Sequence, residues 1–363
     1  MLVCADETFE IYGRSTIVYM VERRMKVLFS SGIGDRIARP VIWIAWERHR
    51  RTIEIAKFLG VHLVIFLSNV SRPLKYFKLA LLSVRTIYHN CPNVVIVQNP
   101  SLVLTALVCI GKNILRYALI VDTHNAGLCY EEYSLPCLYK YVMKWLQRSA
   151  DITIVTNTHL AERVLRNGGT AYVLPDRIPE WPSLRKIKLE GKSTIVCIAN
   201  FGDDEPYRNI FECIELLQND DIVIYITGNY RKALKSGSLP QSGNVIFTDY
   251  LDEEDYWNII YSADLIMDLT TRPDCLVCGA YEAISVGTPM ILSDTNTIRD
   301  YFNKGAIYTK HDPQSIAQSI MTGVQNIDRL RKEVVELKYD LKSTWESQVT
   351  GLISFLRACG GVP

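Results

Sequence analysis

Short runs of apolar, mostly β-branched residues alternate with longer segments of mixed polarity along almost the whole chain. Such runs are typical of strands buried on both faces of a parallel sheet. Twelve strands are predicted in this way, at residues 41–46, 61–67, 94–98, 119–122, 152–156, 171–174, 194–199, 222–227, 245–248, 264–269, 289–292 and 306–309. The segments between them are long enough for helices, as at residues 72–89, 134–149, 207–218 and 253–262. This alternation predicts an α/β protein with doubly wound sheets.

A segment rich in proline and charge, residues 175–192, interrupts the alternation and separates two groups of six strands. The length of 363 residues also exceeds what one hydrophobic core usually supports. We therefore predict two Rossmann-like domains that face a cleft, with a last helix crossing back to the first domain. The expected parts are an N-terminal extension (1–24), the first domain (25–178), a linker (179–192), the second domain (193–340) and the crossover helix (341–363). Whether the extension belongs to the native protein is left open by the sequence.

Composition indicates a folded globular chain, with 48% hydrophobic and 22% charged residues. No apolar run reaches the roughly 18 residues expected of a membrane-spanning helix. The first 24 residues carry acids throughout and lack the apolar core of a signal peptide. Ten scattered cysteines fit a reducing, cytoplasmic compartment, and the lone pair Cys275 and Cys278 has no further ligands for a zinc or redox site.

The net charge of +1 conceals an asymmetry between the two halves of the chain. Residues 25–150 hold 16 Lys and Arg against 6 Asp and Glu, whereas residues 151–363 hold 21 against 29. A basic first half favours an anionic partner such as phosphates, a nucleic acid or a membrane surface, although scattered solvated charge is the alternative. Basic motifs interleaved with aromatic residues are lacking, which disfavours nucleic acid. An anionic membrane, with the protein at its inner face, stays a candidate partner.

Ligands of open α/β sheets bind beyond the carboxyl ends of the strands, so residues that directly follow strands are candidates. His124 follows the predicted strand 119–122 and can donate a hydrogen bond to a phosphate or a sugar hydroxyl; a structural histidine is the alternative. A basic cluster follows the strand at 41–46 and opens a helix, where cations oppose the helix dipole. Its members are Arg48, His49, Arg50 and Arg51. They face either an anionic acceptor or solvent.

In the second half, Glu282 lies within the apolar stretch "CGAYEAISVGTPMIL". Burial of a carboxylate costs free energy unless it is bound, but a Glu on the exposed side of an amphipathic helix is the alternative. Gly279 would lie at the helix start, where backbone N–H groups can hold a pyrophosphate. A carboxylate one turn later can accept hydrogen bonds from a ribose diol. Asp274 on the preceding loop would reach towards the sugar, and Arg208 opens the helix after strand 194–199.

These motifs resemble those of a known family. Asp274 and Glu282 have seven residues between them and are followed by the turn "VGTP", within the block 245–310. The block resembles the donor half of GT-B glycosyltransferases and is most similar to the large retaining family 4 (glycosyl transferases group 1), with its acid-x7-Glu motif. A looser resemblance covers the chain after residue 40. It implies transfer of a sugar from a nucleotide-sugar to a lipid-linked or glycan acceptor in polysaccharide or glycan precursor biosynthesis.

The resemblance also implies roles for single residues. Glu282 would bind the ribose and Asp274 the sugar hydroxyls, while His124 would lie beside the reacting sugar. The diphosphate would be bound by Arg208 and by the amides of Gly279, Ala280 and Tyr281. On the acceptor side we place His49, Arg50 and Arg51. Since no Asp-x-Asp pair follows a strand to hold a metal ion, we expect a metal-independent enzyme without a cofactor, in which Arg208 and the helix amides stabilise the leaving group.

Two departures from the family pattern stand out. The first acid is Asp274 where the family usually has Glu, and Asn200-Phe201 stands where an Arg usually follows the first strand of the donor domain. Arg272 is a candidate to supply the missing charge. A nucleotide-sugar 2-epimerase of the same fold and a non-catalytic GT-B subunit are the alternative functions. Formation of product from the donor alone would indicate an epimerase, and absence of nucleotide binding would indicate a non-catalytic subunit.

Overall fold

The computed structural model describes residues 7–11, 16–21, 40–99, 101–128, 137–181, 183–217, 221–234, 239–240 and 243–360. The chain divides into two compact units. Unit 1 comprises Met1–Arg177 and Trp345–Pro363, and unit 2 comprises Ile178–Thr344. Both are α/β, and all twelve predicted strands are present within one or two residues of their expected ends.

The sheet of unit 1 has the strand order β1-β2-β4-β3-β5-β6-β7-β8. Its strands are β1 (Glu7–Ile11), β2 (Thr16–Val21), β3 (Val41–Ala45), β4 (His62–Ser68), β5 (Val94–Asn99), β6 (Ala118–Thr123), β7 (Ile152–Val155) and β8 (Ala171–Val173). Strands β3 to β8 are parallel, whereas β2 is antiparallel to both β1 and β4. Neither β1 nor β2 was predicted. Both lie within the N-terminal extension and lengthen the sheet at one edge.

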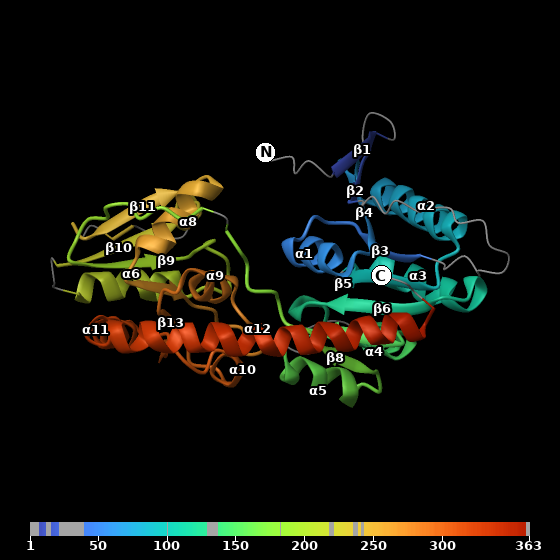
Figure 1. The fold of residues 1–363 in the computed structure, drawn as a ribbon. Coiled ribbons are helices and arrows are strands. Elements are labelled where there is room, and N and C mark those ends of the chain that lie inside the picture. Colours follow the sequence, from blue (N-terminus) through green and yellow to red (C-terminus); the bar gives the residue numbers. More distant parts are fainter. Residues whose placement is uncertain are drawn as a thin grey trace. The chain divides into compact units, whose positions relative to one another are not determined.

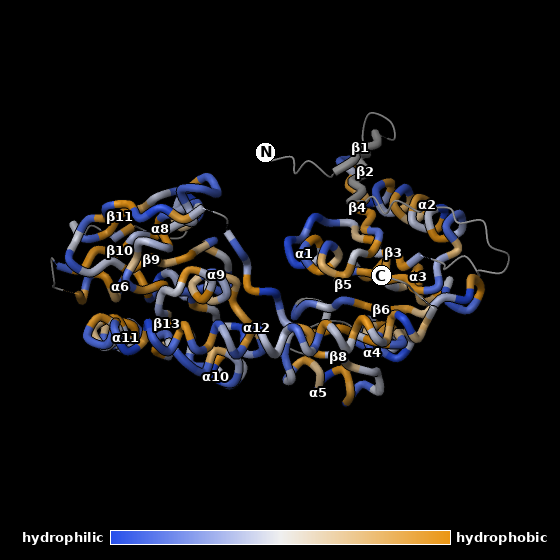
Figure 2. Tube along the Cα trace, viewed as in Figure 1, coloured by the Kyte–Doolittle hydropathy of each residue, from blue (hydrophilic) through white to orange (hydrophobic). Residues whose placement is uncertain are grey.

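Helices cover both faces of this sheet (Figure 1). They are α1 (Arg50–Leu59), α2 (Arg72–Asn90), α3 (Leu102–Leu115), α4 (Cys137–Ser149) and α5 (Thr158–Arg166). Successive side chains of a strand point to opposite faces. In β3, Ile42 and Ile44 therefore pack with α2, α3 and α4, whereas Trp43 packs with α1. The central strands are hydrophobic along their length because helices cover both faces of the sheet (Figure 2).

The sheet of unit 2 is entirely parallel, in the order β11-β10-β9-β12-β13-β14. Its strands are β9 (Ser193–Cys197), β10 (Ile222–Thr227), β11 (Val245–Asp249), β12 (Leu265–Asp268), β13 (Met290–Ser293) and β14 (Ala306–Thr309). The strand order reverses between β9 and β12, and the helices that follow these two strands pack on opposite faces of the sheet. Doubly wound sheets bind ligands at the carboxyl ends of strands at such a reversal.

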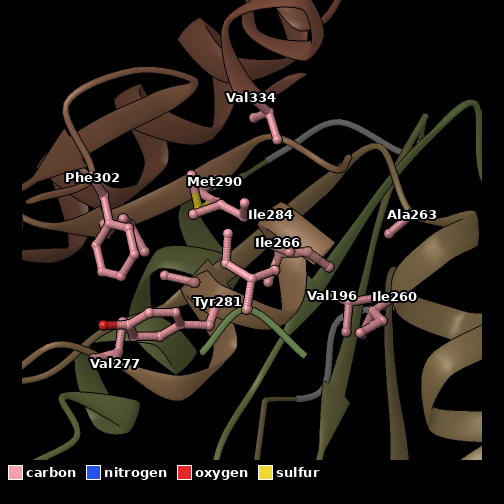
Figure 3. Packing of buried hydrophobic residues seen from close by; sticks show 14 of the residues in the cluster. Val196, Ile260, Ala263, Ile266, Val277, Tyr281, Ile284, Met290, Phe302 and Val334 are labelled. Atoms are coloured by element: carbon pink, nitrogen blue, oxygen red, sulfur yellow. The ribbon is translucent and has the colours of Figure 1, made fainter. Parts of the chain in front are cut away.

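Two hydrophobic clusters hold the helices of unit 2 on the faces of its sheet. The helices are α6 (Tyr207–Leu216), α7 (Arg231–Leu234), α8 (Glu253–Ser262), α9 (Cys278–Val286), α10 (Asn296–Tyr301) and α11 (Pro313–Gln325). Figure 3 shows the cluster beneath α9, where the ring of Tyr281 lies beside that of Phe302, 5.2 Å between centroids. The side chain of Tyr281 therefore belongs to the hydrophobic core, and its backbone lies in the first turn of α9.

The last helix, α12 (Ile327–Ala358), is much longer than predicted. It has 32 residues, with no proline and with its first glycine at position 351, so nothing in its sequence ends it earlier. Val334 and Leu337 pack in the core of unit 2, and Trp345 and Leu352 pack in that of unit 1. The predicted return of the chain to the first domain is confirmed. Among the described helices none is long and apolar enough to cross a membrane.

Candidate functional site

Glu282 lies in the second turn of α9, which begins beyond the carboxyl end of β12. Its side chain is half-buried and accepts a hydrogen bond of 2.5 Å from the hydroxyl of Tyr256 on α8. Burial, followed by the charge of Glu282, raises the pKa of Tyr256 well above its usual value, so this hydroxyl stays protonated as a donor. Tyr256 therefore stabilises and orients the carboxylate. Sequence reasoning missed it because nothing in "DEEDYWN" links it to residue 282.

The start of α9 is occupied by a carboxylate of the protein itself. Asp268, the last residue of β12, accepts a hydrogen bond of 2.8 Å from the amide of Gly279. A Cβ atom at position 279 would lie 2.5 Å from the same carboxylate oxygen, so any other residue there would displace the Asp268 side chain. The expectation that the Gly279 amide binds a diphosphate is therefore corrected. The amides of Ala280 and Tyr281, also in the first turn, remain candidates.

Asp268 is surrounded by other acids. Its pKa is raised from 3.8 to about 7, first by burial and then by the charges of Glu205, Glu282 and Asp204, against the opposing hydrogen bond from Gly279. An acid at the end of an apolar run, as in "DLIMDL", was a signal that could have identified it. The carboxyl end of the unit 2 sheet is thus more acidic than predicted.

Glu205 contacts the loop of the second departure from the family pattern, Asn200-Phe201. Its carboxylate accepts hydrogen bonds from the amides of Asn200 and Phe201, at 2.9 and 2.8 Å. Phe201 has a left-handed backbone with φ of 55°. The loop after β9, where the family usually has Arg, is thus closed by an acid of the same loop.

The two predicted cations of unit 2 differ in their surroundings. Arg208 is exposed at the second residue of α6. Arg272 forms an ion pair with Asp204, 3.2 Å between Nε and Oδ2, so part of its charge is already compensated. Asp274 is half-buried and accepts a hydrogen bond of 3.4 Å from the hydroxyl of Thr297 on α10.

In unit 1, His124 directly follows β6, as predicted. Its ring lies 4.4 Å from that of His49, and its Nε2 atom is 3.5 Å from Nε2 of Gln98. Burial lowers the pKa of His124 below its usual value, with Arg51 and His49 acting in the same direction against Asp122. A neutral imidazole suits hydrogen bonding to a hydroxyl better than pairing with a phosphate.

Unsatisfied polar atoms gather beside His124. Asn99 ends β5 and is in register with Thr123 at the end of β6. Four buried atoms here have no hydrogen-bond partner within the described ranges: His49 Nδ1, Gln98 Oε1, Asn99 Oδ1 and Thr123 Oγ1. Leaving such groups unpaired costs about 1–3 kcal/mol each, so the arrangement favours a polar ligand or water. The pair "QN" at the end of "VVIVQN" was a signal that could have been used.

The structure corrects the expectation for Arg51. Rather than facing an acceptor, its side chain is buried and contacts Asp122 at 3.0 Å, Asp176 at 2.5 Å and the carbonyl of Leu174 at 2.7 Å. Burial alone would lower its pKa, but the two carboxylates raise it, so the guanidinium stays charged. Arg50, by contrast, is exposed as the first residue of α1.

Comparison with known proteins agrees with this arrangement. Residues 180–336, most of unit 2, match the sequence model of the family described as "Glycosyl transferases group 1". Unit 2 is a glycosyl transferases group 1 domain. No curated protein matches the chain.

Most of the chain is similar in structure to several solved proteins. The sucrose-phosphate synthase of Thermosynechococcus elongatus has a TM-score of 0.72 at 12% identity, over 88% of this chain and 98% of that one. Anabaena HepE, in complex with UDP-glucose, has 0.69 at 14% identity, over 87% and 100%. The lipopolysaccharide outer core galactosyltransferase WaaB has 0.59 at 11% identity, over 85% and 99%. At such identities the structural similarity establishes only the fold, which is GT-B. The family assignment of unit 2 rests on the match to the sequence model.

Proposed function

We propose that the chain transfers a sugar from a nucleotide-sugar donor to a lipid-linked or glycan acceptor, with retention of anomeric configuration. The observation that carries the proposal is the placement of Glu282. Its carboxylate lies in the second turn of α9, at the carboxyl end of a parallel sheet and within a glycosyl transferases group 1 domain, and it is oriented by Tyr256 on α8. A carboxylate held there can accept both hydrogen bonds of a ribose diol.

The rest of the donor site is proposed from the same domain. Arg208 and the amides of Ala280 and Tyr281 would stabilise the diphosphate leaving group, and Asp274 would bind hydroxyls of the sugar. Within the described residues, no three His, Cys, Asp or Glu side chains gather as a metal site would require. Metal-independent transfer remains a prediction, to be tested by activity in EDTA.

In unit 1, we assign sugar recognition to the polar group around His124. A neutral His124 would exchange hydrogen bonds with a sugar hydroxyl, and the unsatisfied atoms of Gln98, Asn99 and Thr123 would accept or donate others. Sites built from buried hydrogen-bonding groups reject analogues that lack the matching hydroxyl. His49 belongs to this group, whereas the buried Arg51 does not.

The replacement Glu282→Ala tests the donor site. Loss of hydrogen bonds to a charged group is expected to cost roughly 1.5–3 kcal/mol, or about 10- to 100-fold in affinity for the preferred nucleoside diphosphate. Thermal shift identifies that nucleotide, because ligand at 100 times its Kd adds about 2.7 kcal/mol of stability. Titration calorimetry then compares wild type with the variant. Glu254→Ala, an exposed acid on α8, is the matched control and should bind as wild type does.

Equal affinity of wild type and Glu282→Ala would refute the donor site. Product analysis separates the proposed reaction from its alternative: a transferase releases little product until an acceptor is added, whereas a 2-epimerase converts donor alone. Absence of any nucleotide-dependent stabilisation would instead favour a non-catalytic subunit.

A further inference from the structure

Helix α2 exposes an apolar stripe on the side opposite its packed face. Leu79 and Ile87 point into the core of unit 1. Five other large apolar residues, spaced three or four apart, are 41–69% exposed: Leu74, Phe77, Leu81, Val84 and Tyr88. Spacing of this kind puts them on one side of the helix. The helix thus has a second apolar face that the core of unit 1 does not cover.

The two neighbouring helices repeat this feature. α2 packs against α3 and α3 against α4, and all three cover the same face of the sheet. Ile110 and Ile114 on α3 are 62% and 74% exposed, and Leu138 and Tyr141 on α4 are 73% and 71% exposed. Together the three helices carry 12 of the 21 exposed large hydrophobic residues of the described chain. We call this surface the α2–α4 face.

Its charge is entirely of one sign. The three helices contain eight Lys and Arg and no Asp or Glu: Arg72, Lys75, Lys78, Arg85, Lys112, Lys140, Lys144 and Arg148. The acid nearest in sequence, Asp151, follows α4 and pairs with Lys112. Several cations stand next to residues of the apolar stripe in sequence, as Lys75 does beside Leu74 and Lys78 beside Phe77. Long basic side chains can lie along an apolar surface and keep their charge in the polar layer.

We propose that the α2–α4 face docks on an anionic lipid bilayer. Amphipathic helices with basic flanks and exposed Leu, Phe and Trp bind the interface between lipid headgroups and acyl chains. Anionic headgroups complement three helices that contain eight cations and no acids, although Lys112 is already paired with Asp151. Pairing this face with the same face of a second copy would instead bring like charges together. The proposal locates membrane contact on these helices, not on the turn at Arg50 and Arg51. It goes beyond the transfer reaction and does not depend on it.

Vesicle sedimentation tests the apolar part of the contact without donor or acceptor. Full-length protein should bind phosphatidylcholine vesicles that contain phosphatidylglycerol. Phe77→Ser/Leu81→Ser should lower this binding about tenfold or more, since two large apolar side chains no longer enter the interface. The matched control is Val335→Ser/Tyr339→Ser on α12, where two residues of the same spacing are 63% and 77% exposed. Its binding should equal that of wild type.

A second pair of variants tests the charge. Arg72→Gln/Arg85→Gln removes two exposed cations of the α2–α4 face and should lower binding about tenfold or more, because each cation near an anionic membrane contributes about 1 kcal/mol. Lys188→Gln/Lys332→Gln removes two exposed cations of unit 2 and should leave binding unchanged. Binding by wild type should also fall in high salt and on pure phosphatidylcholine.

Failure to bind anionic vesicles, or equal binding by all four variants, would overturn the proposal. A second result would also overturn it: wild type is a dimer in light scattering, Phe77→Ser/Leu81→Ser is a monomer, and neither binds vesicles. The α2–α4 face would then be the contact surface between two copies of the chain. Circular dichroism and the thermal midpoint of each variant establish that it is folded. Nucleotide binding should be unaltered in all four, so failure here is distinguishable from failure of the proposed function.

Discussion

Replacing Arg51 by methionine is expected to destabilise unit 1 by about 3–5 kcal/mol, because removal of this partner leaves the buried carboxylate of Asp122 without compensation. Asp122 is fully buried, and Arg51 is its ion-pair partner at 3.0 Å. The same guanidinium also bonds Asp176 and the Leu174 carbonyl, so it connects α1 to two later segments of unit 1. Native-state hydrogen exchange measures the loss, since peptides from unit 2 serve as an internal reference.

Arg50→Met is the matched control, because Arg50 is adjacent in sequence but exposed. Its effect should stay within about 0.5 kcal/mol. Adding Asp122→Asn to Arg51→Met should restore part of the lost stability by removing the stranded charge. If Arg51→Met lowers the stability of unit 1 no more than Arg50→Met does, the ion pair does not stabilise the fold. The role in anion binding first expected of Arg51 would then have to be reconsidered.

Asp268→Asn is expected to stabilise unit 2 by about 2–4 kcal/mol at pH 8 and by almost nothing near pH 4. The folded-state pKa of about 7 lies above the ordinary value of 3.8, so the folded protein favours the protonated acid. Wild-type stability should therefore fall by about 1.4 kcal/mol for each pH unit as the pH rises from about 4 to 7. Above pH 7 it should level off. An Asn retains an oxygen acceptor for the Gly279 amide, while its buried NH₂ offsets part of the gain.

Hydrogen exchange of unit 2 peptides between pH 4 and pH 8, corrected for intrinsic exchange rates, measures this difference. Asp264→Asn is the control at the other end of the same strand, where the carboxylate pairs with Arg331 at 3.0 Å and accepts from the Thr194 amide. That variant should be less stable than wild type at pH 8, the opposite sign. A constant difference between wild type and Asp268→Asn across the pH range would mean that Asp268 does not titrate near neutrality.

The candidate site was predictable where one short stretch contains both the residue and its reason. Glu282 was found because a charge within an apolar helix demands a partner, and His124 because it directly follows a buried strand. Tyr256 and Asp268 were missed because each acts on a different element of the fold, whereas Glu205 acts within its own loop, where it is one of three neighbouring acids. The amide of Gly279 was assigned to a ligand when a carboxylate of the protein already binds it.

By itself, the sequence determined the local elements and the layers of this protein. Twelve apolar runs became strands, and α12 was underestimated only because no residue marks where it begins. Periodicity suffices for this, since the spacing of apolar positions is a property of one segment. Tertiary structure decided which charges are buried and which apolar stripes are covered. Arg50 and Arg51 are alike as a sequence, yet the fold exposes one and pairs the other with Asp122. Likewise, both sides of α2 are apolar, and only packing decides that Leu79 is covered and Phe77 is not, because burial depends on neighbours that periodicity does not specify.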